Sequence, residues 1–547
     1  MSARHGGQIL VDQLRIQGVE RVFCIPGESF LAALDGLHQS QIHTVVCRQE
    51  GGAAMMAEAH GKLTGKPGVA FVTRGPGATN ASAGIHIAFH DSTPMVLFVG
   101  QVARDQRDRE AFQEVDYRRM FAPLAKWVAE IEVTERIPEY VSQAFHVAAS
   151  GRPGPVVLAL PEDMLSAEAD AADALPASLP GAAASQADVE AVLDGLQGAQ
   201  RPLAVVGGPG WSDAASQALG RFAEATALPV GAAFRCQDYL DNRHPCYVGD
   251  VGIGINPKLA DRVKTADLLL VLGARLGEMT TSGYTLVDIP NPRQRLIHVH
   301  PDPSELGRVY RPERAVAAAA GVFVQQLAEA AAGSRKEPGD WLAAARADYE
   351  DWQQLRETPG ALKMEQVIAH LGRVLPDDAI LTNGAGNYSA WLHRYHRYKT
   401  WRSQLAPTSG SMGYGLPAAV AAKLQYPDRD VICLAGDGCF QMTMQELGTA
   451  AQYGAGVVVL VSNNGLYGTI RMHQERSYPG RPSGTDIVNP DFAALAVAYG
   501  GYGEVVSRDA DFPEALARAR DAARTARRPA VLELRISPDA LTPRSTV

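Results

Sequence analysis

Short runs of apolar residues alternate with segments of helical periodicity along most of the chain. In the first third, apolar runs at Arg21–Ile25 and Val69–Val72 flank a helical pattern from Gly51 to Leu63, and another run follows at Met95–Val99. Continuous apolar runs are typical of parallel strands that are buried on both faces, and the connecting helices cover those faces. The pattern predicts a doubly wound α/β domain.

The same alternation recurs twice further along the chain. The later apolar runs are Leu203–Val206, Leu268–Leu272 and Leu296–Val299 in the middle, and Val431–Ala435, Val457–Val461 and Ala530–Leu534 towards the end. Two segments rich in Ala and Pro, 167–188 and roughly 333–360, have weak periodicity and are expected to be linkers. We therefore predict an α/β protein of three doubly wound parallel-sheet domains, over residues 1–166, 189–332 and 361–547, which suits the 547 residues of the chain.

Charge and composition narrow the class of partner. The chain has 51 Lys and Arg against 60 Asp and Glu, so its acidic balance argues against a nucleic-acid partner. No apolar run approaches the roughly 18 residues of a membrane helix, and the first residues lack the basic-then-apolar order of a signal peptide. We expect a cytoplasmic protein with no membrane partner. Six cysteines without CxxC spacing predict free thiols rather than disulfides or a zinc site.

Two polar motifs follow neighbouring apolar runs in the last third of the chain. Gly436-Asp437-Gly438 comes after the first run, and Asn464, which ends an Asn-Asn pair after the next run, lies 27 positions beyond Asp437. A divalent cation bound to a diphosphate takes carboxylate, amide and carbonyl oxygens, and glycines let the backbone approach the phosphates. Either motif alone is also a common turn. Both together, after strands whose carboxyl ends bind ligands in α/β sheets, predict a metal and diphosphate site.

This pair of motifs resembles the signature of the thiamine diphosphate-dependent enzymes. Further segments resemble the acetohydroxyacid (acetolactate) synthase branch, in matching order: RQEGGAAMMAEAHGKLTGKPG from Arg48, GPGATN from Gly75, DSTPM from Asp91, GQV from Gly100, AFQE from Ala111 and GSMGYGLPAA from Gly410. The resemblance implies a pyrimidine-binding domain, a middle domain and a diphosphate-binding domain. These correspond to the three domains predicted from the hydrophobic pattern.

The resemblance assigns most of the cofactor site. Glu50 matches the glutamate that bonds the aminopyrimidine ring of thiamine diphosphate and favours the imino tautomer that removes the thiazolium proton, whereas by itself it is a carboxylate at a helix start. Met412 matches an apolar wedge under the cofactor, with a core methionine as the alternative. The other residues expected to bind the cofactor are Pro76, Asn80, Gly386, Asn387, Tyr388, Gly410, Gly436, Asp437, Gly438, Cys439, Asn464, Leu466, Tyr467 and Gly468. Asp437, Asn464 and the carbonyl of Leu466 are expected to bind Mg²⁺.

The substrate side combines matches with departures from the branch. Phe112 and Gln113 match a pair that lines the substrate side, with a core position as the alternative for Phe112. Glu28 stands where simple 2-oxoacid decarboxylases carry an acid, and an acid there could protonate an enamine; an ordinary turn glutamate is the alternative. His473 stands where the biosynthetic enzymes carry Trp, and is either a polar or acid-base group or a surface residue.

Three further departures concern the pocket and a second cofactor. Thr469 replaces a Met that shapes the second-substrate pocket, and Glu162 replaces a lysine. Met279 replaces the second of two arginines, with Arg275 kept. Because the missing arginine helps to hold FAD and the acceptor carboxylate in the family, its loss disfavours FAD as a cofactor and a 2-oxoacid as the acceptor.

The sequence predicts an enzyme that uses thiamine diphosphate and Mg²⁺ to decarboxylate a small 2-oxoacid, pyruvate by default, and to ligate the acyl-anion equivalent to a carbonyl acceptor. Formation of acetolactate is the simplest case. The alternatives are a non-ligating decarboxylase, a related carbon–carbon lyase or acyltransferase, and a non-catalytic cofactor-binding paralogue. In the family the cofactor lies between two subunits, so a homodimer or a dimer of dimers is expected.

Overall fold

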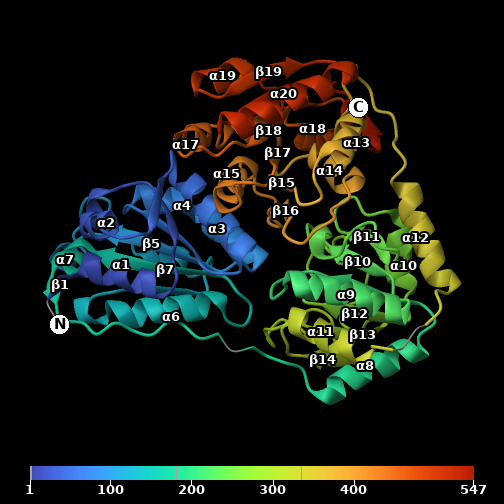
Figure 1. The fold of residues 1–547 in the computed structure, drawn as a ribbon, viewed down its shortest axis with the longest axis horizontal. Helices are drawn as coiled ribbons and strands as arrows, with labels where there is room; N and C mark the ends of the chain where they lie inside the picture. Colours follow the sequence, from blue (N-terminus) through green and yellow to red (C-terminus); the bar gives the residue numbers. More distant parts are fainter. Residues whose placement is uncertain (1–2, 180, 334–335, 547) are drawn as a thin grey trace.

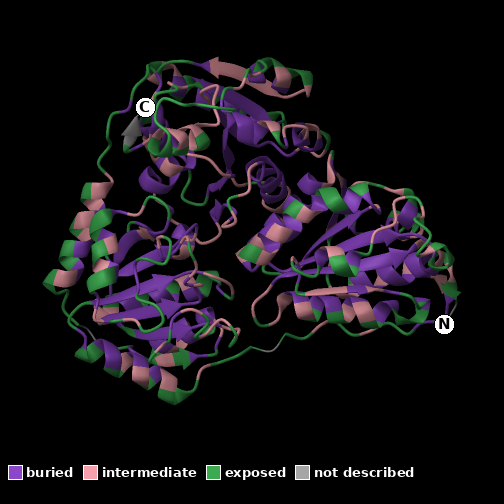
Figure 2. Cartoon of the chain, turned by 180° about the vertical axis from the view of Figure 1, so that it is seen from behind, coloured by how far each residue is buried: buried purple, intermediate pink, exposed green. Residues whose placement is uncertain are grey.

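The computed structural model describes residues 3–179, 181–333 and 336–546. Three six-stranded sheets, each entirely parallel, lie in three domains that meet at the centre of the molecule (Figure 1). Helices cover both faces of the sheets, whose strands are largely buried (Figure 2). The prediction of three doubly wound α/β domains is confirmed, and the residue boundaries given above stay predictions.

The N-terminal domain has the strand order β3-β2-β4-β5-β7-β6. Its strands are β2 (Arg21–Cys24), β3 (His43–Val46), β4 (Gly68–Val72), β5 (Met95–Gln101), β6 (Trp127–Glu130) and β7 (Pro155–Pro161). Its helices are α1 (Gly6–Ile16), α2 (Leu31–His38), α3 (Glu50–Thr64), α4 (Pro76–Asp91), α5 (Tyr117–Phe121), α6 (Ile137–Ala149) and α7 (Glu162–Ser166). The short strands β1 (Arg4–His5) and β8 (Glu168–Ala169) pair at its edge. The chain changes direction across the sheet between β2 and β4, where α/β sheets bind ligands.

The middle domain has the order β11-β10-β9-β12-β13-β14. Its strands are β9 (Pro202–Val206), β10 (Val230–Ala233), β11 (Tyr247–Val251), β12 (Leu268–Leu272), β13 (Arg295–Val299) and β14 (Arg314–Val316). Its helices are α8 (Gln186–Gly198), α9 (Asp213–Thr226), α10 (Pro257–Thr265) and α11 (Ala320–Ala330). The change of direction lies between β9 and β12.

The C-terminal domain has the order β16-β15-β17-β18-β20-β19. Its strands are β15 (Ile380–Asn383), β16 (Gln404–Leu405), β17 (Val431–Gly436), β18 (Val458–Asn463), β19 (Tyr502–Val506) and β20 (Ala530–Arg535), followed by the hairpin β21 (Ala540–Thr542) and β22 (Ser545–Thr546). Its helices are α13 (Met364–Val374), α14 (Ser389–Tyr395), α15 (Gly415–Gln425), α16 (Asp437–Gln441), α17 (Glu446–Gln452), α18 (Gly468–Ser477), α19 (Phe492–Ala498) and α20 (Phe512–Thr525). The change of direction lies between β15 and β17.

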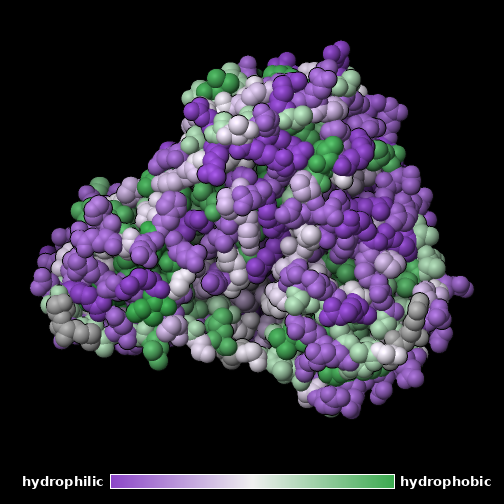
Figure 3. Space-filling model, in the orientation of Figure 1, coloured by the Kyte–Doolittle hydropathy of each residue, from purple (hydrophilic) through white to green (hydrophobic). Residues whose placement is uncertain are grey.

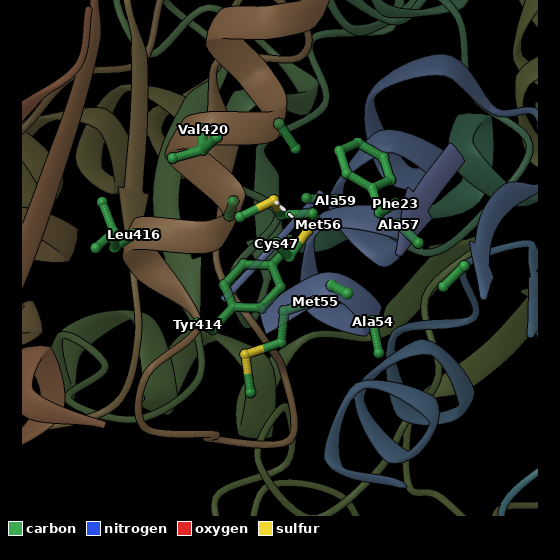
Figure 4. Close-up of a cluster of buried hydrophobic side chains, with 14 of the residues drawn as sticks. Phe23, Cys47, Ala54, Met55, Met56, Ala57, Ala59, Tyr414, Leu416 and Val420 are labelled. Atoms are coloured by element: carbon green, nitrogen blue, oxygen red, sulfur yellow. Dashed lines mark hydrogen bonds between the residues drawn. The ribbon is translucent and has the colours of Figure 1, made fainter. Parts of the chain in front are cut away.

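Helices α3 and α15 join the N-terminal and C-terminal domains through one shared hydrophobic core. Met56 on α3 is fully buried, and Leu416 and Val420 on α15 are buried in the same cluster (Figure 4). Both helices are rich in Gly and Ala, so their backbones can approach closely. This packing holds the loops of the two sheets in a defined relative position.

The two predicted linkers differ in structure. Residues 170–179 and 181–184 contain neither helix nor strand, and residue 180 lies outside the described residues. Within the second segment, α12 (Asp340–Trp352) packs against the middle domain and buries Leu342, Ala345 and Tyr349 in its cores. The expectation of a bare linker is therefore wrong for residues 340–352, because an Ala-rich composition with sparse apolar positions can still form a helix when one face is covered.

The surface of the described residues is mixed in polarity, and the cysteines are unpaired. On the face in Figure 3, hydrophobic residues are scattered among hydrophilic ones. No helix within the described residues has the length and apolarity needed to cross a membrane. All six cysteines are free thiols, as predicted, and five of them are buried.

Candidate active site

Asp437 lies at the carboxyl end of β17 and is buried, with 3% of its surface exposed. Its Oδ1 accepts from the amide of Gly438 at 2.8 Å, and its Oδ2 accepts from the amide of Gly465 at 2.8 Å. Burial raises the pKa of this carboxyl. Among the described residues it forms no ion pair with a basic side chain, so its charge is uncompensated and a cation would be stabilised beside it.

Three asparagines surround this carboxylate. The Oδ1 of Asn464 accepts from the amide of Leu466 at 3.1 Å. The Nδ2 of Asn489 donates to Asp437 Oδ2 at 2.8 Å and to Asn463 Oδ1 at 2.9 Å. Asn489 was missed because it lies in a loop without a recognisable motif. Carboxylate, amide and nearby carbonyl oxygens together form a donor set that fits Mg²⁺.

Glycines bring the loops after β15 and β17 unusually close to two tyrosine rings. A Cβ on Gly436 would lie 2.9 Å from the ring of Tyr388, and one on Gly438 would lie 2.6 Å from the ring of Tyr467. Gly386 has φ near +150°, a conformation that side chains rarely adopt, and its Cβ would also meet Tyr388. Three of the glycines predicted from the resemblance, Gly386, Gly436 and Gly438, are thus required by close packing against tyrosine rings.

The remaining predicted residues of this domain connect those loops. Cys439 Sγ accepts from the hydroxyl of Tyr388 and from the amide of Gly413, each at 3.2 Å. The hydroxyl of Thr469 accepts from the amide of Asn387 at 2.9 Å. These contacts link the loop that follows β15, the Gly410–Met412 turn and the first turn of α18. Three remaining predicted positions are half-buried in these loops: Met412, Leu466 and Gly468.

A second group of predicted residues lies on the N-terminal domain. Glu50 is the first residue of α3, and its Oε2 accepts from the Nδ2 of Asn80 on α4 at 3.0 Å. Pro76 begins α4 and is exposed. The buried Glu446 of the C-terminal domain accepts from the amide of Arg48 at 3.1 Å, two residues before Glu50. The structure therefore anchors the start of α3 from two sides while leaving the Glu50 carboxylate partly accessible.

The predicted substrate-side residues gather next to this group. Phe112 is 71% exposed in a loop, so its alternative interpretation as a core residue is wrong. Gln113 follows with φ near +65°, and Glu28 begins the short helix η1 (Glu28–Phe30) after β2. Arg74, which the sequence analysis did not single out, bonds both Glu28 and the carbonyl of Phe112.

The side chain of His473 is exposed on α18 and forms no hydrogen bond or ion pair with the described residues. Likewise, no hydrogen bond or ion pair within the described ranges joins the Glu50 group to the Asp437 group. The Glu50 group lies on the N-terminal domain, and the Asp437 group lies on the C-terminal domain.

A large cavity, about 1670 Å³ in volume, lies at the junction of the three domains. It reaches from Gly208 and Arg275, at the direction change of the middle sheet, to Asn387 and Thr469 of the C-terminal domain. Arg235, another residue that the sequence analysis missed, crosses its wall and donates to the carbonyl of Gly384 at 3.0 Å. No pattern in the sequence predicts this position for Arg235, because its contacts form only when the middle and C-terminal domains pack together.

Comparison with known proteins identifies the family of the chain. Family models match three segments: the thiamine pyrophosphate enzyme N-terminal TPP binding domain (residues 4–120), central domain (189–327) and C-terminal TPP binding domain (384–534). An acetolactate synthase large subunit from Parasynechococcus marenigrum is 35% identical, covering 90% of this chain and 82% of the relative. Two large subunits from Escherichia coli strain K12, of acetolactate synthase isozymes 2 and 3, are 31% and 32% identical over 92% and 96% of this chain and 91% and 94% of their own. The chain therefore belongs to the thiamine pyrophosphate enzymes and is an acetolactate synthase-like member of that family.

Proposed function

We propose that the protein decarboxylates a small 2-oxoacid and ligates the resulting acyl-anion equivalent to a carbonyl acceptor, with pyruvate to acetolactate as the simplest case. The observation that carries this proposal is the pairing of two features in one chain. One is the accessible Glu50 carboxylate held by Asn80, and the other is the uncompensated Asp437 carboxylate beside Asn464. The printed names of the relatives, acetolactate synthase large subunits, support the reaction class.

In this proposal the side chains of the protein bind the cofactor and transfer a proton. Thiamine diphosphate, when bound, supplies the carbon nucleophile and the electron sink for decarboxylation. Glu50 accepts and returns a proton at the aminopyrimidine ring, while Asn80 holds the carboxyl in place. Asp437, Asn464 and the carbonyl of Leu466 hold Mg²⁺ against the diphosphate, and Cys439 with Gly436 and Gly438 shape the backbone around it.

A second copy of the chain completes the site. The Glu50 group lies on the N-terminal domain and the Asp437 group on the C-terminal domain. In the family that the sequence resembles, the cofactor lies between two subunits. We infer a homodimer, alone or as a dimer of dimers, in which each site takes one group from each copy. Dilution to nanomolar protein, followed by sizing and activity, tests this assembly: an active monomer would refute it.

The cavity at the junction of the three domains bears on whether the protein binds FAD. The cavity exceeds the volume of about 300–1,000 Å³ that is usual for small-molecule sites, so a dinucleotide would fit by size. Its wall, however, carries Met279 where relatives of this branch carry an arginine, and Arg275 is already paired with Glu305 at 3.3 Å. We propose an enzyme that does not depend on FAD, which the absorbance spectrum of the purified protein tests directly.

The primary experiment incubates the protein with thiamine diphosphate, Mg²⁺ and a panel of 2-oxoacids, and identifies the products by mass spectrometry. Acetolactate from pyruvate is the expected result. Aldehyde alone would favour the non-ligating decarboxylase, with Glu28 as the proton donor. No consumption of any acid by cofactor-loaded protein would contradict the proposal and favour a non-catalytic paralogue.

A further inference from the structure

Arg74 lies at the direction change of the N-terminal sheet, two residues after β4. Only 7% of its surface is exposed. The loop after the adjacent strand β2 carries Glu28, so the two side chains approach across the point where ligands bind in α/β sheets. Arg74 therefore occupies a central place among the substrate-side residues, although no motif marks it.

Every nitrogen of the Arg74 guanidinium is engaged. Nη2 donates to Glu28 Oε1 at 3.1 Å, and Nη1 donates to Glu162 Oε2 at 2.9 Å. Nε donates to the backbone carbonyl of Phe112 at 3.1 Å. One planar group thus connects the loops that follow β2, β4, β5 and β7. Three of the five N–H donors of Arg74 are thus directed at protein atoms.

The residue after Arg74 fixes the same loop from a second side. A Cβ on Gly75 would lie 2.8 Å from the Cβ of Gln113, so the two backbones are in direct contact. The amide of Gly75 donates to the hydroxyl of Tyr117 at 2.8 Å, at the far end of that loop. With Gln113 at φ near +65°, the loop turns sharply here and leaves the Phe112 side chain projecting outward. The Phe112 carbonyl is held while its ring is exposed.

We propose that Arg74 is a positioning residue of the active site: it sets the orientation of the Glu28 carboxylate and of the Phe112-Gln113 turn relative to the reacting carbon. This inference rests on the proposed function, since it assigns the substrate side to these residues. Arg74 also neutralises one of the two carboxylates that it contacts. Its loss would release Glu28, which is 65% exposed, into solvent, without opening a cavity in a hydrophobic core.

The test compares Arg74→Met and Arg74→Lys with Arg136→Met as a matched control. Arg136 is a half-exposed arginine of the same domain, and its carboxylate partner, Glu139 at 2.6 Å, is not one of the predicted site residues. For each variant, kcat and KM for pyruvate, the ratio of aldehyde to ligated product, the affinity for thiamine diphosphate and the unfolding temperature are measured. The last two report on the fold and the cofactor, and the first three report on positioning.

Arg74→Met is expected to lower kcat/KM about 10- to 100-fold, the usual cost of misplacing groups around a reacting centre. It should also change the product ratio, with cofactor affinity and unfolding temperature close to those of Arg136→Met. Arg74→Lys should recover part of the loss, because it restores the charge but not the three directed bonds. An unchanged product ratio and unchanged kcat/KM would overturn the proposal.

Two outcomes of the experiment distinguish a failure of this inference from a failure of the proposed function. If the unmodified protein consumes no 2-oxoacid, the proposed function fails, and the comparison does not begin. If the unmodified protein is active and both Arg74 variants match the control, the positioning role alone is refuted. Should Arg74→Met fail to fold, Arg74→Lys decides, since it keeps the positive charge beside Glu28 and Glu162: a product ratio equal to that of the control would refute the role.

Discussion

Lys62 supplies the positive charge that faces two buried carboxylates at the junction of the N-terminal and C-terminal domains. Its Nζ lies 3.3 Å from Glu58 and forms a shorter contact with Asp91, and these carboxylates are 0% and 1% exposed. Glu58 also accepts from the hydroxyl of Tyr414 at 2.6 Å, and Asp91 accepts from the amide of Thr408 at 2.8 Å. Replacing Lys62 by Met would leave two carboxylates buried together without this cation.

The cost follows from the geometry. Removing one partner of a buried ion pair usually destabilises by about 3–5 kcal/mol. The Lys62 side chain is 23% exposed, so water can partly solvate the carboxylates that it leaves behind, and the lower end applies. We expect Lys62→Met to reduce the free energy of unfolding by about 3 kcal/mol. Lys66→Met is the control, because Lys66 is exposed and forms no ion pair within the described part of the chain.

The penalty should depend on pH with a definite sign. Burial raises the pKa of Glu58, and Lys62 opposes that rise. Without Lys62 the folded-state pKa moves further above the unfolded value, so the protonated carboxyl favours folding and the ionised one opposes it. The difference between the variant and the unmodified protein should therefore shrink as pH falls from about 8 to about 5.5.

Urea unfolding at both pH values measures this difference. The free energies are compared through the urea midpoints of the two variants and the unmodified protein, with one common slope of free energy against urea concentration. Unfolding followed by tryptophan fluorescence and by circular dichroism shows whether the domains separate in one transition. A midpoint equal to that of Lys66→Met, or a penalty that grows towards acid pH, would refute the reasoning.

Three further predictions concern the site itself. Asp437→Asn removes the uncompensated charge and should weaken Mg²⁺-dependent cofactor binding at least about 10- to 100-fold, as measured by quenching of protein fluorescence during titration. Glu50→Gln should lower turnover about 10²- to 10⁴-fold with the fold unchanged, and unchanged turnover would sink the proposed mechanism. Gly436→Ala places a Cβ 2.9 Å from Tyr388, so cofactor affinity should fall, whereas the same change at the open position Gly372 should have no effect on affinity.

Much of this protein could be predicted from local pattern. The apolar runs became buried parallel strands because a strand covered on both faces must be apolar throughout. Asp437 and Asn464 could be linked before the structure was known, since each directly follows such a run and adjacent parallel strands present their carboxyl ends together. The glycines around them are required by contacts with Tyr388 and Tyr467, for which the resemblance gave the position but not the reason.

Other features depend on contacts between residues far apart in the chain. Asn489 reaches Asp437 across 52 positions, and Arg74 reaches Glu162 across 88. Neither Asn489 nor Arg74 lies in a sequence motif. A hydrogen bond between two loops needs only one suitable side chain on each loop, and a single residue forms no recognisable pattern. Helix α12 was missed for a related reason, since its three buried residues are covered only when the helix packs against the middle domain.

The sequence alone therefore determined the architecture, because the burial of parallel strands is encoded in consecutive apolar residues. Its resemblance to a known family indicated the cofactor class, and the residues that each loop would contribute to the site stay predictions. Only the tertiary structure decided how these loops combine. It showed that Phe112 is exposed and that its backbone carbonyl accepts a hydrogen bond from Arg74. The physical reason is that orientation, burial and charge compensation are set by packing between distant segments, and these have no local signature in the chain.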